Sequence, residues 1–532
     1  MILNPTRTRT IVSVFSAACA LFPWSAAIAA PLFLAPIAYN AGGSGTEFVA
    51  VADVNGDGRS DLIVAVQNDP GGAHARNGLV AVFLGNGDGT FQPPVTYDSG
   101  GSDPFSLAIA DLNGDGAQDI VVANFCVWIG GSCSSTTIGV LLGRGDGTFD
   151  PVVAWNAGGN SATSVAVGDV NRDGKPDIVF PIQVGFNFAV GVLLGNGDGT
   201  FQPPSFAYTT GISQQIALAD LNRDGALDVV LAGYNWRDDG QSAAVVSVLI
   251  GHGDGTFEPA ATYDTGAPAG TLANSVAVGD LNGDGVLDLA VAVYATSTTA
   301  ILLGNGNGTF APAVLYGSGG TLAWSETIAD VNGDGKADVI VAGAAGTIGV
   351  LLGNGNGTFQ PVRTFSVPAA TSIAAADVNG DGRLDLLVTT GNDAVSVLLN
   401  SSGCDAAPVI TLSASPGSLW PPNGKMVPVI VSGRVADGGC GVNASATTYA
   451  VQDEYAEVQP AGPIELNADG RFSFTILLRA SRRGNDRDGR LYTITVRAEN
   501  STGAAASSTR GVRVPHDRGG SLSGADIDAP GR

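Results

Sequence analysis

The chain is poor in basic residues, in histidine and in cysteine. Its 532 residues include 25 Lys and Arg against 49 Asp and Glu, which gives a formal net charge of −24. This composition excludes the basic surface that binds nucleic acid backbones. The three histidines, His74, His252 and His516, are far apart in the sequence, and neither G-x-S-x-G nor H-E-x-x-H occurs. The common serine-hydrolase and zinc-protease motifs are therefore absent.

Long apolar runs are also scarce, and the only candidate lies at the N-terminus. Arg7 and Arg9 precede the apolar stretch 11–22, and Ala27-Ile28-Ala29 follows as an A-x-A site. This pattern predicts a signal peptide over residues 1–30, cleaved near Ala29 or Ala30, and an exported protein that is secreted or held at the cell surface. A lipoprotein attached through Cys19 is the less favoured alternative, because Ser16 replaces the Leu expected three residues earlier.

Four cysteines remain after the predicted signal peptide. An even number in an exported chain favours two disulfides, and pairing of near neighbours gives Cys126–Cys133 and Cys404–Cys440. Neither pair has the C-x-x-C spacing typical of a zinc site.

What the chain has in abundance is aspartate and glycine. Only seven of the 49 acidic residues are Glu, and there are 76 Gly. The segment DVNGDGRSD, residues 53–61, is the first of seven similar segments that begin 47 to 60 residues apart, and a period of this size indicates a propeller or a solenoid.

Each repeat has further constant parts. An apolar strand precedes the Asp-rich segment and another follows it; then come an apolar strand ending in a turn such as GNGDG (85–89) and a strand of the form F-x-x-P-x-x-Y. Four short strands per repeat predict a propeller blade. The seventh repeat stops at Asn400 without its last strand, while Phe33, Pro36 and Tyr39 match that strand's pattern. We therefore expect the N-terminal strand to complete the last of seven blades and close the ring.

The Asp-rich segment places oxygen-bearing side chains at alternate positions of a nine-residue loop. A plain β-turn is the alternative, but it does not require the Asp at position 9 that every copy has. The pattern favours Ca²⁺, with up to seven structural ions. The candidate ligands are, at position 1, Asp53, Asp111, Asp169, Asp220, Asp280, Asp330 and Asp377; at position 3, Asn55, Asn113, Asn171, Asn222, Asn282, Asn332 and Asn379; at position 5, Asp57, Asp115, Asp173, Asp224, Asp284, Asp334 and Asp381; at position 7, through the backbone carbonyl, Arg59, Ala117, Lys175, Ala226, Val286, Lys336 and Arg383; and at position 9, Asp61, Asp119, Asp177, Asp228, Asp288, Asp338 and Asp385.

These loops resemble the D-x-D/N-x-D-G-x-x-D calcium loops of FG-GAP (VCBS-type) repeats, which form the propeller of integrin α-subunits. The resemblance covers about residues 31–400. It implies a calcium-binding propeller that binds partners on the rim away from calcium. The chain departs from integrin propellers in two ways. All seven repeats here carry a loop, whereas integrin propellers carry one in only some blades. Position 3 is Asn in every copy, which lowers the ligand charge.

The two rims of such a ring differ in how closely the repeats agree. The Asp loops and the GNGDG turns lie on one rim and are nearly identical among the copies. The connections on the other rim vary in length and sequence. They carry aromatic and basic residues of the kind that form binding hot spots, namely Phe125, Trp128, Phe186, Tyr234, Trp236, Arg76 and Arg237.

After the repeats the sequence pattern changes. Residues 401–407 read as a linker, 408–515 as alternating strands of an Ig-like β-sandwich, and 516–532 as a disordered tail. LWPPNGKMVPV (419–429) and RLYTITVRAEN (490–500) resemble bacterial HYR-like or PKD-like Ig modules, which implies a spacer or an adhesion unit.

The predicted fold class is thus all-β: a seven-bladed propeller over residues 31–400 followed by an Ig-like sandwich. The predicted function is adhesion or protein interaction, with a protein or glycan ligand on the variable rim. No catalytic residue is identified, and nucleic acid is not expected as a partner. A lectin-like propeller with sugar pockets between blades, and a calcium-dependent polysaccharide lyase, remain alternatives.

Overall fold

The computed structural model describes residues 32–68, 78–129, 132–236, 240–402, 407–436, 442–467, 470–486, 488–500 and 503–516. The predicted signal peptide, Arg76, Arg237, Cys404 and Cys440 lie outside these residues, and only the backbone is described for Cys126, Trp128 and Cys133. The described chain is all-β apart from one 3-10 turn, η1 (Ala444–Ala446).

Residues 37–398 form seven antiparallel sheets of four strands each, here called blades 1 to 7. The blades, from inner to outer strand, are β2 (Ser44–Ala52), β3 (Asp61–Asn68), β4 (Leu79–Phe83) and β5 (Val95–Asp98); β6 (Ser102–Ala110), β7 (Asp119–Ile129), β8 (Ser132–Leu141) and β9 (Val153–Asn156); β10 (Ala166–Gly168), β11 (Asp177–Val184), β12 (Asn187–Leu193) and β13 (Ser205–Thr209); β14 (Ile212–Ala219), β15 (Asp228–Trp236), β16 (Ser242–Leu249) and β17 (Ala261–Asp264); β18 (Leu272–Gly279), β19 (Asp288–Tyr294), β20 (Thr298–Leu302) and β21 (Val314–Gly317); β22 (Ala323–Ala329), β23 (Asp338–Gly343), β24 (Thr347–Leu351) and β25 (Arg363–Ser366); and β26 (Ser372–Ala376), β27 (Asp385–Thr389), β28 (Ala394–Leu398) and β1 (Ile37–Asn40).

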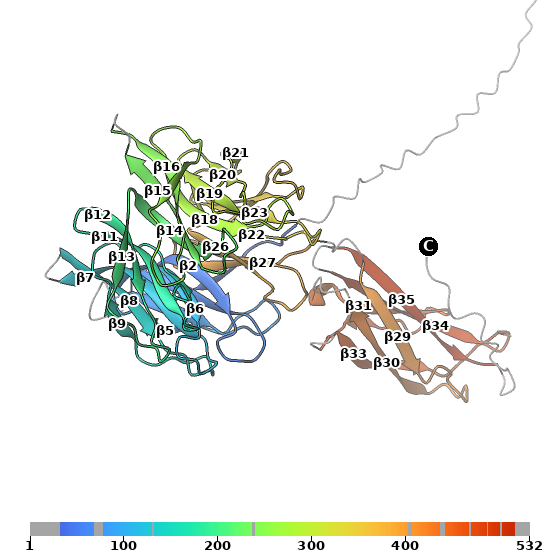
Figure 1. The fold of residues 1–532 in the computed structure, drawn as a ribbon. Helices are drawn as coiled ribbons and strands as arrows, with labels where there is room; N and C mark the ends of the chain where they lie inside the picture. Colours follow the sequence, from blue (N-terminus) through green and yellow to red (C-terminus); the bar gives the residue numbers. More distant parts are fainter. Residues whose placement is uncertain are drawn as a thin grey trace, which may run out of the picture.

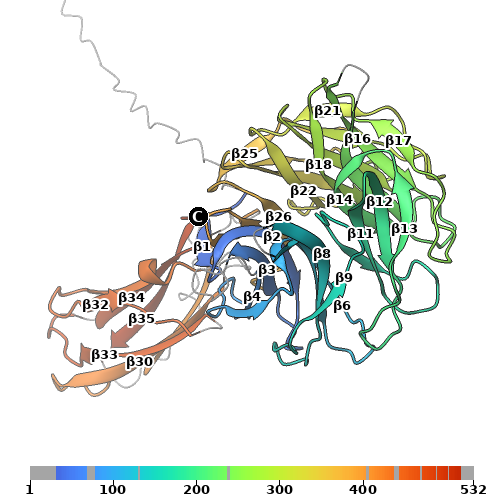
Figure 2. The ribbon, with the colours of Figure 1, turned by 90° about the vertical axis from the view of Figure 1, so that its left-hand side faces the viewer.

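The blades form a closed ring. Each inner strand contacts the inner strand of the next blade, and β26 contacts β2, so the cycle has no open end. The N-terminal strand β1 pairs antiparallel with β28, and Phe33 forms a β-bridge to Asn400. In Figure 2 the inner strands β2, β22 and β26 lie near the middle of the array, with the outer strands β13, β17 and β21 at its outside. The fold is a β-propeller, as predicted.

The burial of each strand follows from its place in the blade. The second and third strands lie between neighbouring blades, so both of their faces are apolar and buried, as in β19 and β23. Six of the seven outer strands are exposed except at one position that holds an aromatic ring, whereas β13 has three half-buried positions. That ring packs edge-to-face on the Phe that precedes the outer strand of the adjacent blade, with centroids 5.1–5.4 Å apart; the pairs are Tyr39–Phe91, Tyr97–Phe149, Trp155–Phe201, Tyr263–Phe310, Tyr316–Phe359 and Phe365–Phe33. The recurring F-x-x-P-x-x-Y pattern therefore encodes contacts between blades.

Residues 409–514 form two further sheets, drawn in orange and red in Figure 1. One sheet has the order β29-β30-β33 and the other β32-β31-β34-β35. Their strands are β29 (Val409–Ser415), β30 (Met426–Ala436), β31 (Thr448–Asp453), β32 (Ala461–Pro463), β33 (Arg471–Arg479), β34 (Arg490–Glu499) and β35 (Ala505–Val514). Sequence reasoning identified five of these strands and missed β31 and β32. Classification of this region as an Ig-type module stays a prediction.

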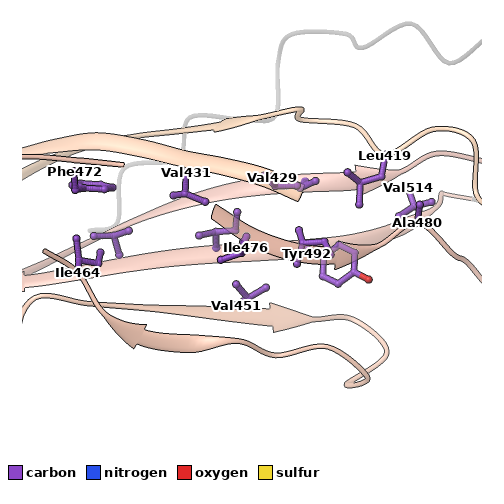
Figure 3. Packing of buried hydrophobic residues seen from close by; sticks show 14 of the residues in the cluster. Leu419, Val429, Val431, Val451, Ile464, Phe472, Ile476, Ala480, Tyr492 and Val514 are labelled. Atoms are coloured by element: carbon purple, nitrogen blue, oxygen red, sulfur yellow. The ribbon is translucent and has the colours of Figure 1, made fainter. Parts of the chain in front are cut away.

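One apolar core joins these two sheets. Val429 and Val431 from β30 and Ile476 from β33 pack against Val451 from β31 and Tyr492 from β34 (Figure 3). A charged pair lies at the edge of this core: Arg490 and Asp453 are both completely buried, and the Arg490 Nε donates to Asp453 Oδ1 over 2.9 Å.

The predicted disulfides have no counterpart among the described residues. The backbone register places Cys133 opposite Trp128 rather than opposite Cys126, and Cys404 and Cys440 are not described, so both pairings stay predictions. In the described part of the chain, no helix has the length and apolarity needed to cross a membrane.

Candidate functional site

The seven Asp loops have the same backbone shape. Position 6 is Gly with φ between 78° and 87°, and position 4 also has a positive φ in every copy. Position 4 is Gly in five loops, whereas Arg172 and Arg223 adopt φ values of 59° and 63°. Left-handed backbone at two alternate positions turns successive N–H groups toward the inside of the loop.

Those N–H groups bind the predicted ligand side chains. In the first loop, Asp53 Oδ1 accepts the N–H of Gly56 over 2.7 Å and Asp53 Oδ2 accepts that of Gly58 over 2.7 Å. Asn55 Oδ1 accepts the N–H of Asp57 over 3.0 Å, and Asp57 Oδ1 accepts that of Arg59 over 2.9 Å. The side chains at positions 1, 3 and 5 are thus gathered over one short run of backbone.

The Asp at position 9 has a different environment. It is completely buried in all seven copies. Asp61 Oδ2 accepts the N–H of Val54 in its own loop over 3.0 Å, and Oδ1 accepts the N–H of Gly85 in the next hairpin turn over 2.8 Å. The same two bonds recur in every blade, to Leu112 and Gly143, Val170 and Gly195, Leu221 and Gly251, Leu281 and Gly304, Val331 and Gly353, and Val378 and Asn400. The Asp at position 9 therefore links its Asp loop to the following hairpin turn on the same rim.

Burial raises the pKa of each position-9 carboxyl, and the two backbone N–H groups oppose that shift. The pKa reaches about 6 in Asp338 and about 7 in Asp385. The aspartates at positions 1 and 5 raise it further by charge repulsion.

The donor chemistry of each loop suits a hard cation in part. Two carboxylates and one amide oxygen at positions 1, 3 and 5, with the carbonyl at position 7, are the oxygen ligands that Ca²⁺ prefers. The position-9 carboxylate, however, is bonded to backbone through both oxygens. Within the residues that the structure describes, no group of three or more Asp, Glu, His or Cys side chains is arranged to hold a metal ion. Calcium binding stays a prediction.

Two of the loops carry an Arg at position 4, and each of these side chains reaches the loop of the next blade. Arg172 Nη2 donates to Asp224 Oδ1 over 3.0 Å and to the Asp224 carbonyl over 2.8 Å, in the loop of the next blade. Arg223 donates in the same way to the carbonyl of Gly285. The basic side chains thus lower the net negative charge between neighbouring loops of blades 3 to 5.

The opposite rim carries the aromatic residues that the sequence singled out. Phe186 is 98% exposed and Trp236 is 64% exposed, and Tyr234 packs edge-to-face against Trp236 with centroids 5.8 Å apart. Phe125 packs instead against Phe105, with centroids 5.4 Å apart. This rim therefore presents separate aromatic groups, each from a different blade.

A pocket that sequence reasoning missed lies on the ring axis. Its volume is about 100 Å³, and all seven blades line it, five through their inner strands and blades 3 and 7 through residues just before β10 and β26. We call it the axial pocket. The inner strands run toward the Asp loops, and the lining residues occur early in them, so the pocket opens toward the opposite rim.

Five of the lining residues occupy β-bulges at the same place in their strands: Glu47, Phe105, Gln214, Asn274 and Trp324. A bulge re-aims a side chain and often occurs next to a functional site. The only sequence signal was that these positions differ among otherwise similar repeats.

One residue after these bulges, and at Ser164 and Ser372 in blades 3 and 7, polar side chains lie against the next blade around the axis. The Ser164, Ser275 and Ser372 hydroxyls each accept a backbone N–H from the next blade, over 3.4, 3.1 and 3.4 Å, and Gln215 Oε1 accepts one over 2.7 Å. Ser106 holds the corresponding position in blade 2. It is 2% exposed, and its Oγ has no hydrogen-bond partner among the described residues.

Comparison with known proteins agrees with this architecture. The chain is a β-propeller in which each blade carries one Asp loop. The model of the FG-GAP-like repeat matches residues 53–122, 126–180, 220–291, 288–341 and 330–388, together more than half of the chain. The chain belongs to the FG-GAP-like repeat family.

Similar solved structures include a lectin of Agrocybe aegerita that recognises non-reducing terminal N-acetylglucosamine, with 22% identity, a TM-score of 0.43, and coverage of 66% of this chain and 87% of the lectin. Another is the periplasmic gluconolactonase PpgL of Pseudomonas aeruginosa, with 17% identity, a TM-score of 0.43, and coverage of 60% and 88%. A search among curated proteins finds no significant match.

Proposed function

We propose that the chain is an exported, calcium-binding propeller that acts as an adhesion or protein-interaction module through the rim opposite the Asp loops. The observation that supports this most strongly is the contrast between the rims. All seven blades repeat the same position-9 bonds on the loop rim, whereas the opposite rim presents exposed aromatic rings that differ between blades. A constant rim serves the scaffold, and a variable rim with exposed Phe186 and Trp236 suits recognition.

Calcium is proposed as a structural ion. The side chains at positions 1, 3 and 5 and the carbonyl at position 7 would hold it. A bound Ca²⁺ supplies positive charge that offsets the repulsion between carboxylates. No catalytic role is proposed for the chain: His252 lies exposed on the loop rim, and no histidine lines the axial pocket among the described residues.

The test compares rim variants in a binding assay. The chain without residues 1–30 is immobilised in a buffer that contains Ca²⁺ and exposed to a protein extract. Bound proteins are then eluted and identified by mass spectrometry. A Phe186→Ser, Trp236→Ser double variant changes the opposite rim, and His252→Asn is the control on the loop rim. We expect specific partners to bind the parent and the control but not the double variant. Partners that bind all three equally, or glycan-array hits in place of protein partners, would contradict the proposal.

A further inference from the structure

The Asp loops of blades 2 and 4 offer a cation the same donor atoms. Their sequences, DLNGDGAQD (111–119) and DLNRDGALD (220–228), agree at positions 1, 3, 5, 7 and 9. Their internal bonds agree as well, because Asp115 and Asp224 at position 5 each accept the side-chain amide of the position-3 Asn over 2.9 Å. The donor atoms themselves therefore give no reason for the two loops to bind a cation differently.

The loop of blade 4 also holds a positive charge that comes from the blade before it. Arg172, at position 4 of the blade 3 loop, donates through Nη2 to Asp224 Oδ1 over 3.0 Å and to the Asp224 carbonyl over 2.8 Å. Its Nε donates to the Gly225 carbonyl over 3.2 Å. One guanidinium thus binds a carboxylate oxygen and two carbonyl oxygens of the loop, which are the kinds of oxygen that a hard cation takes.

Arg172 takes a place that a basic residue of the same blade fills elsewhere. A Cβ at Gly253, in the hairpin turn of blade 4, would lie 2.7 Å from Arg172 Nε. At the equivalent Gly of blades 1, 3 and 6, the nearest side chain is that of position 7 in the same blade, at 3.0–3.1 Å, namely Arg59, Lys175 and Lys336. Position 7 in blade 4 is the uncharged Ala226. Arg172 therefore supplies to this loop the charge that its own position 7 lacks.

The loop of blade 2 has no such charge. Its position 7 is Ala117, and the loop before it carries Gly56 rather than Arg at position 4. In the described part of the chain, no hydrogen bond or ion pair joins a Lys or Arg to residues 111–119, and Arg144 in the following hairpin turn pairs instead with Asp150 over 2.5 Å. The three carboxylates of this loop therefore repel one another without a basic partner.

We propose that Arg172 is a built-in cation of the blade 4 loop and competes with Ca²⁺ there, so that the blade 2 loop is the stronger calcium site of this matched pair. The inference deepens the proposed function and rests on its calcium part. Calcium in the blade 4 loop has to displace the guanidinium from Asp224 or bind beside its positive charge, and either lowers the affinity.

The experiment is hydrogen exchange with mass spectrometry on the chain without residues 1–30, titrated with Ca²⁺ from a buffer that contains EDTA. Peptides that cover residues 111–119 and 220–228 report the two loops separately. We expect the blade 2 loop to gain protection at a free Ca²⁺ concentration roughly tenfold below that for the blade 4 loop, because hydrogen bonds from a charged group are given up only in blade 4. In EDTA alone, the blade 4 loop should be the better protected of the two.

Two variants move the charge in opposite directions. Arg172→Gly gives position 4 the residue that five of the loops have; it should lower the Ca²⁺ midpoint of the blade 4 loop roughly tenfold and reduce the protection of that loop in EDTA. Gly56→Arg gives the blade 1 loop the Arg that blade 3 has, and should raise the Ca²⁺ midpoint of the blade 2 loop. Arg144→Asn removes one charge from the same rim; it is the control and leaves the blade 4 midpoint unchanged.

The outcomes separate this inference from the proposed function. Equal midpoints of the two loops in the parent, or a blade 4 midpoint that Arg172→Gly shifts no more than Arg144→Asn does, would overturn the inference while structural calcium stands. A blade 2 midpoint that Gly56→Arg leaves unchanged would also contradict it. If Ca²⁺ protects neither loop, the inference and the calcium part of the proposed function both fail.

Discussion

The carboxylate of Asp61 accepts the backbone N–H of Gly85 over 2.8 Å, and so ties the first Asp loop to the following hairpin turn. A Cβ added to Gly85 would lie 2.2 Å from the carbonyl oxygen of Ser60, so a larger residue here would force the backbone to shift. In blade 7 the partner is Asn400, whose backbone N–H takes the same role over 2.7 Å. The Asp at position 9 of the loop and the first residue of the hairpin turn, which recur along the chain, thus serve one contact.

Substitution of Asp61 is expected to destabilise the propeller even without calcium. In Asp61→Asn, one of the two oxygens becomes an NH₂ group that faces a backbone N–H in a completely buried site. The expected loss is about 3 kcal/mol in the free energy of unfolding, since hydrogen bonds to a charged group are broken without replacement. Urea unfolding in excess EDTA measures it.

Asp57→Asn is the matched variant at position 5 of the same loop. Asp57 accepts the N–H of Arg59 through one oxygen, and an amide oxygen can do the same. We expect unfolding in EDTA to match the parent while calcium binding weakens. Equal effects of the two variants in EDTA would refute the separate roles of positions 5 and 9.

Removal of calcium is expected to lower the melting temperature. If each Kd lies about tenfold below the free Ca²⁺ concentration, each bound ion contributes roughly 1.4 kcal/mol. Differential scanning calorimetry with Ca²⁺ and then with excess EDTA tests this, and Mg²⁺ at the same concentration controls for general screening. A melting temperature that EDTA leaves unchanged would exclude structural calcium.

Much of the propeller was predictable because its signals repeat. Seven Asp loops, six GNGDG-type turns and the aromatic residue of the outer strand each recur at fixed spacing, and the N-terminal copy of the last strand indicated how the ring closes. The role of Asp61 was not predictable, because side chains at positions 1 and 9 of a loop look alike in sequence. Only the fold shows that Asp53 faces the loop and Asp61 faces the next turn.

The axial pocket escaped prediction for a different reason. Glu47 and Trp324 belong to inner strands whose other residues follow a simple apolar pattern, and a bulge has no reliable sequence signature. Their convergence depends on seven blades being arranged around one axis. Likewise β31 was missed because its six residues, TYAVQD, do not alternate between apolar and polar.

The buried pair in the C-terminal sheets predicts acid sensitivity. Hydrogen bonds from Arg490 and from backbone N–H groups overcome the effect of burial and lower the pKa of Asp453 to about 2. A carboxyl with a depressed pKa stabilises the fold above its unfolded pKa of about 3.9. That stabilisation is lost as the pH falls from about 4 toward 2. The protection factors for hydrogen exchange in β31 and β34 should therefore fall over this range.

Asp453→Asn is expected to accelerate exchange in β31 and β34 already at pH 7. It removes the buried carboxylate that pairs with Arg490 and leaves the partly exposed Glu457, 3.2 Å from Arg490 Nη2, as the remaining carboxylate partner, at a cost of about 3 kcal/mol. Glu499→Gln, which removes the partner of the largely exposed Arg497 in β34, is the control and should change stability by less than about 1 kcal/mol. Similar exchange in both variants would show that burial gives the Asp453–Arg490 pair no special weight.

A second buried acid, Glu326, lies between blades 5 and 6. The Thr299 hydroxyl donates to its Oε2 over 2.8 Å, and its Oε1 has no partner among the described residues. The other six blades place an apolar residue at the position of Glu326: Val49, Leu107, Val165, Ile216, Val276 and Ile373. Burial raises the pKa of Glu326 well above its usual value, so the folded state holds its proton where the unfolded state has released it.

The double variant Glu326→Val, Thr299→Val is therefore expected to be more stable than the parent, and increasingly so as the pH rises. Between the unfolded pKa of about 4.3 and the raised folded pKa, the folded parent binds more protons than the unfolded parent, so its stability falls with pH. We expect a gain of about 1–3 kcal/mol at pH 7 and a smaller one at pH 4. Urea unfolding of both proteins at the two pH values measures the difference, and changes in the Asp loops cancel because both proteins share them.

Glu326→Val alone leaves the Thr299 hydroxyl unpaired and should gain less. A gain that does not depend on pH would show that Glu326 is ionised in the folded protein.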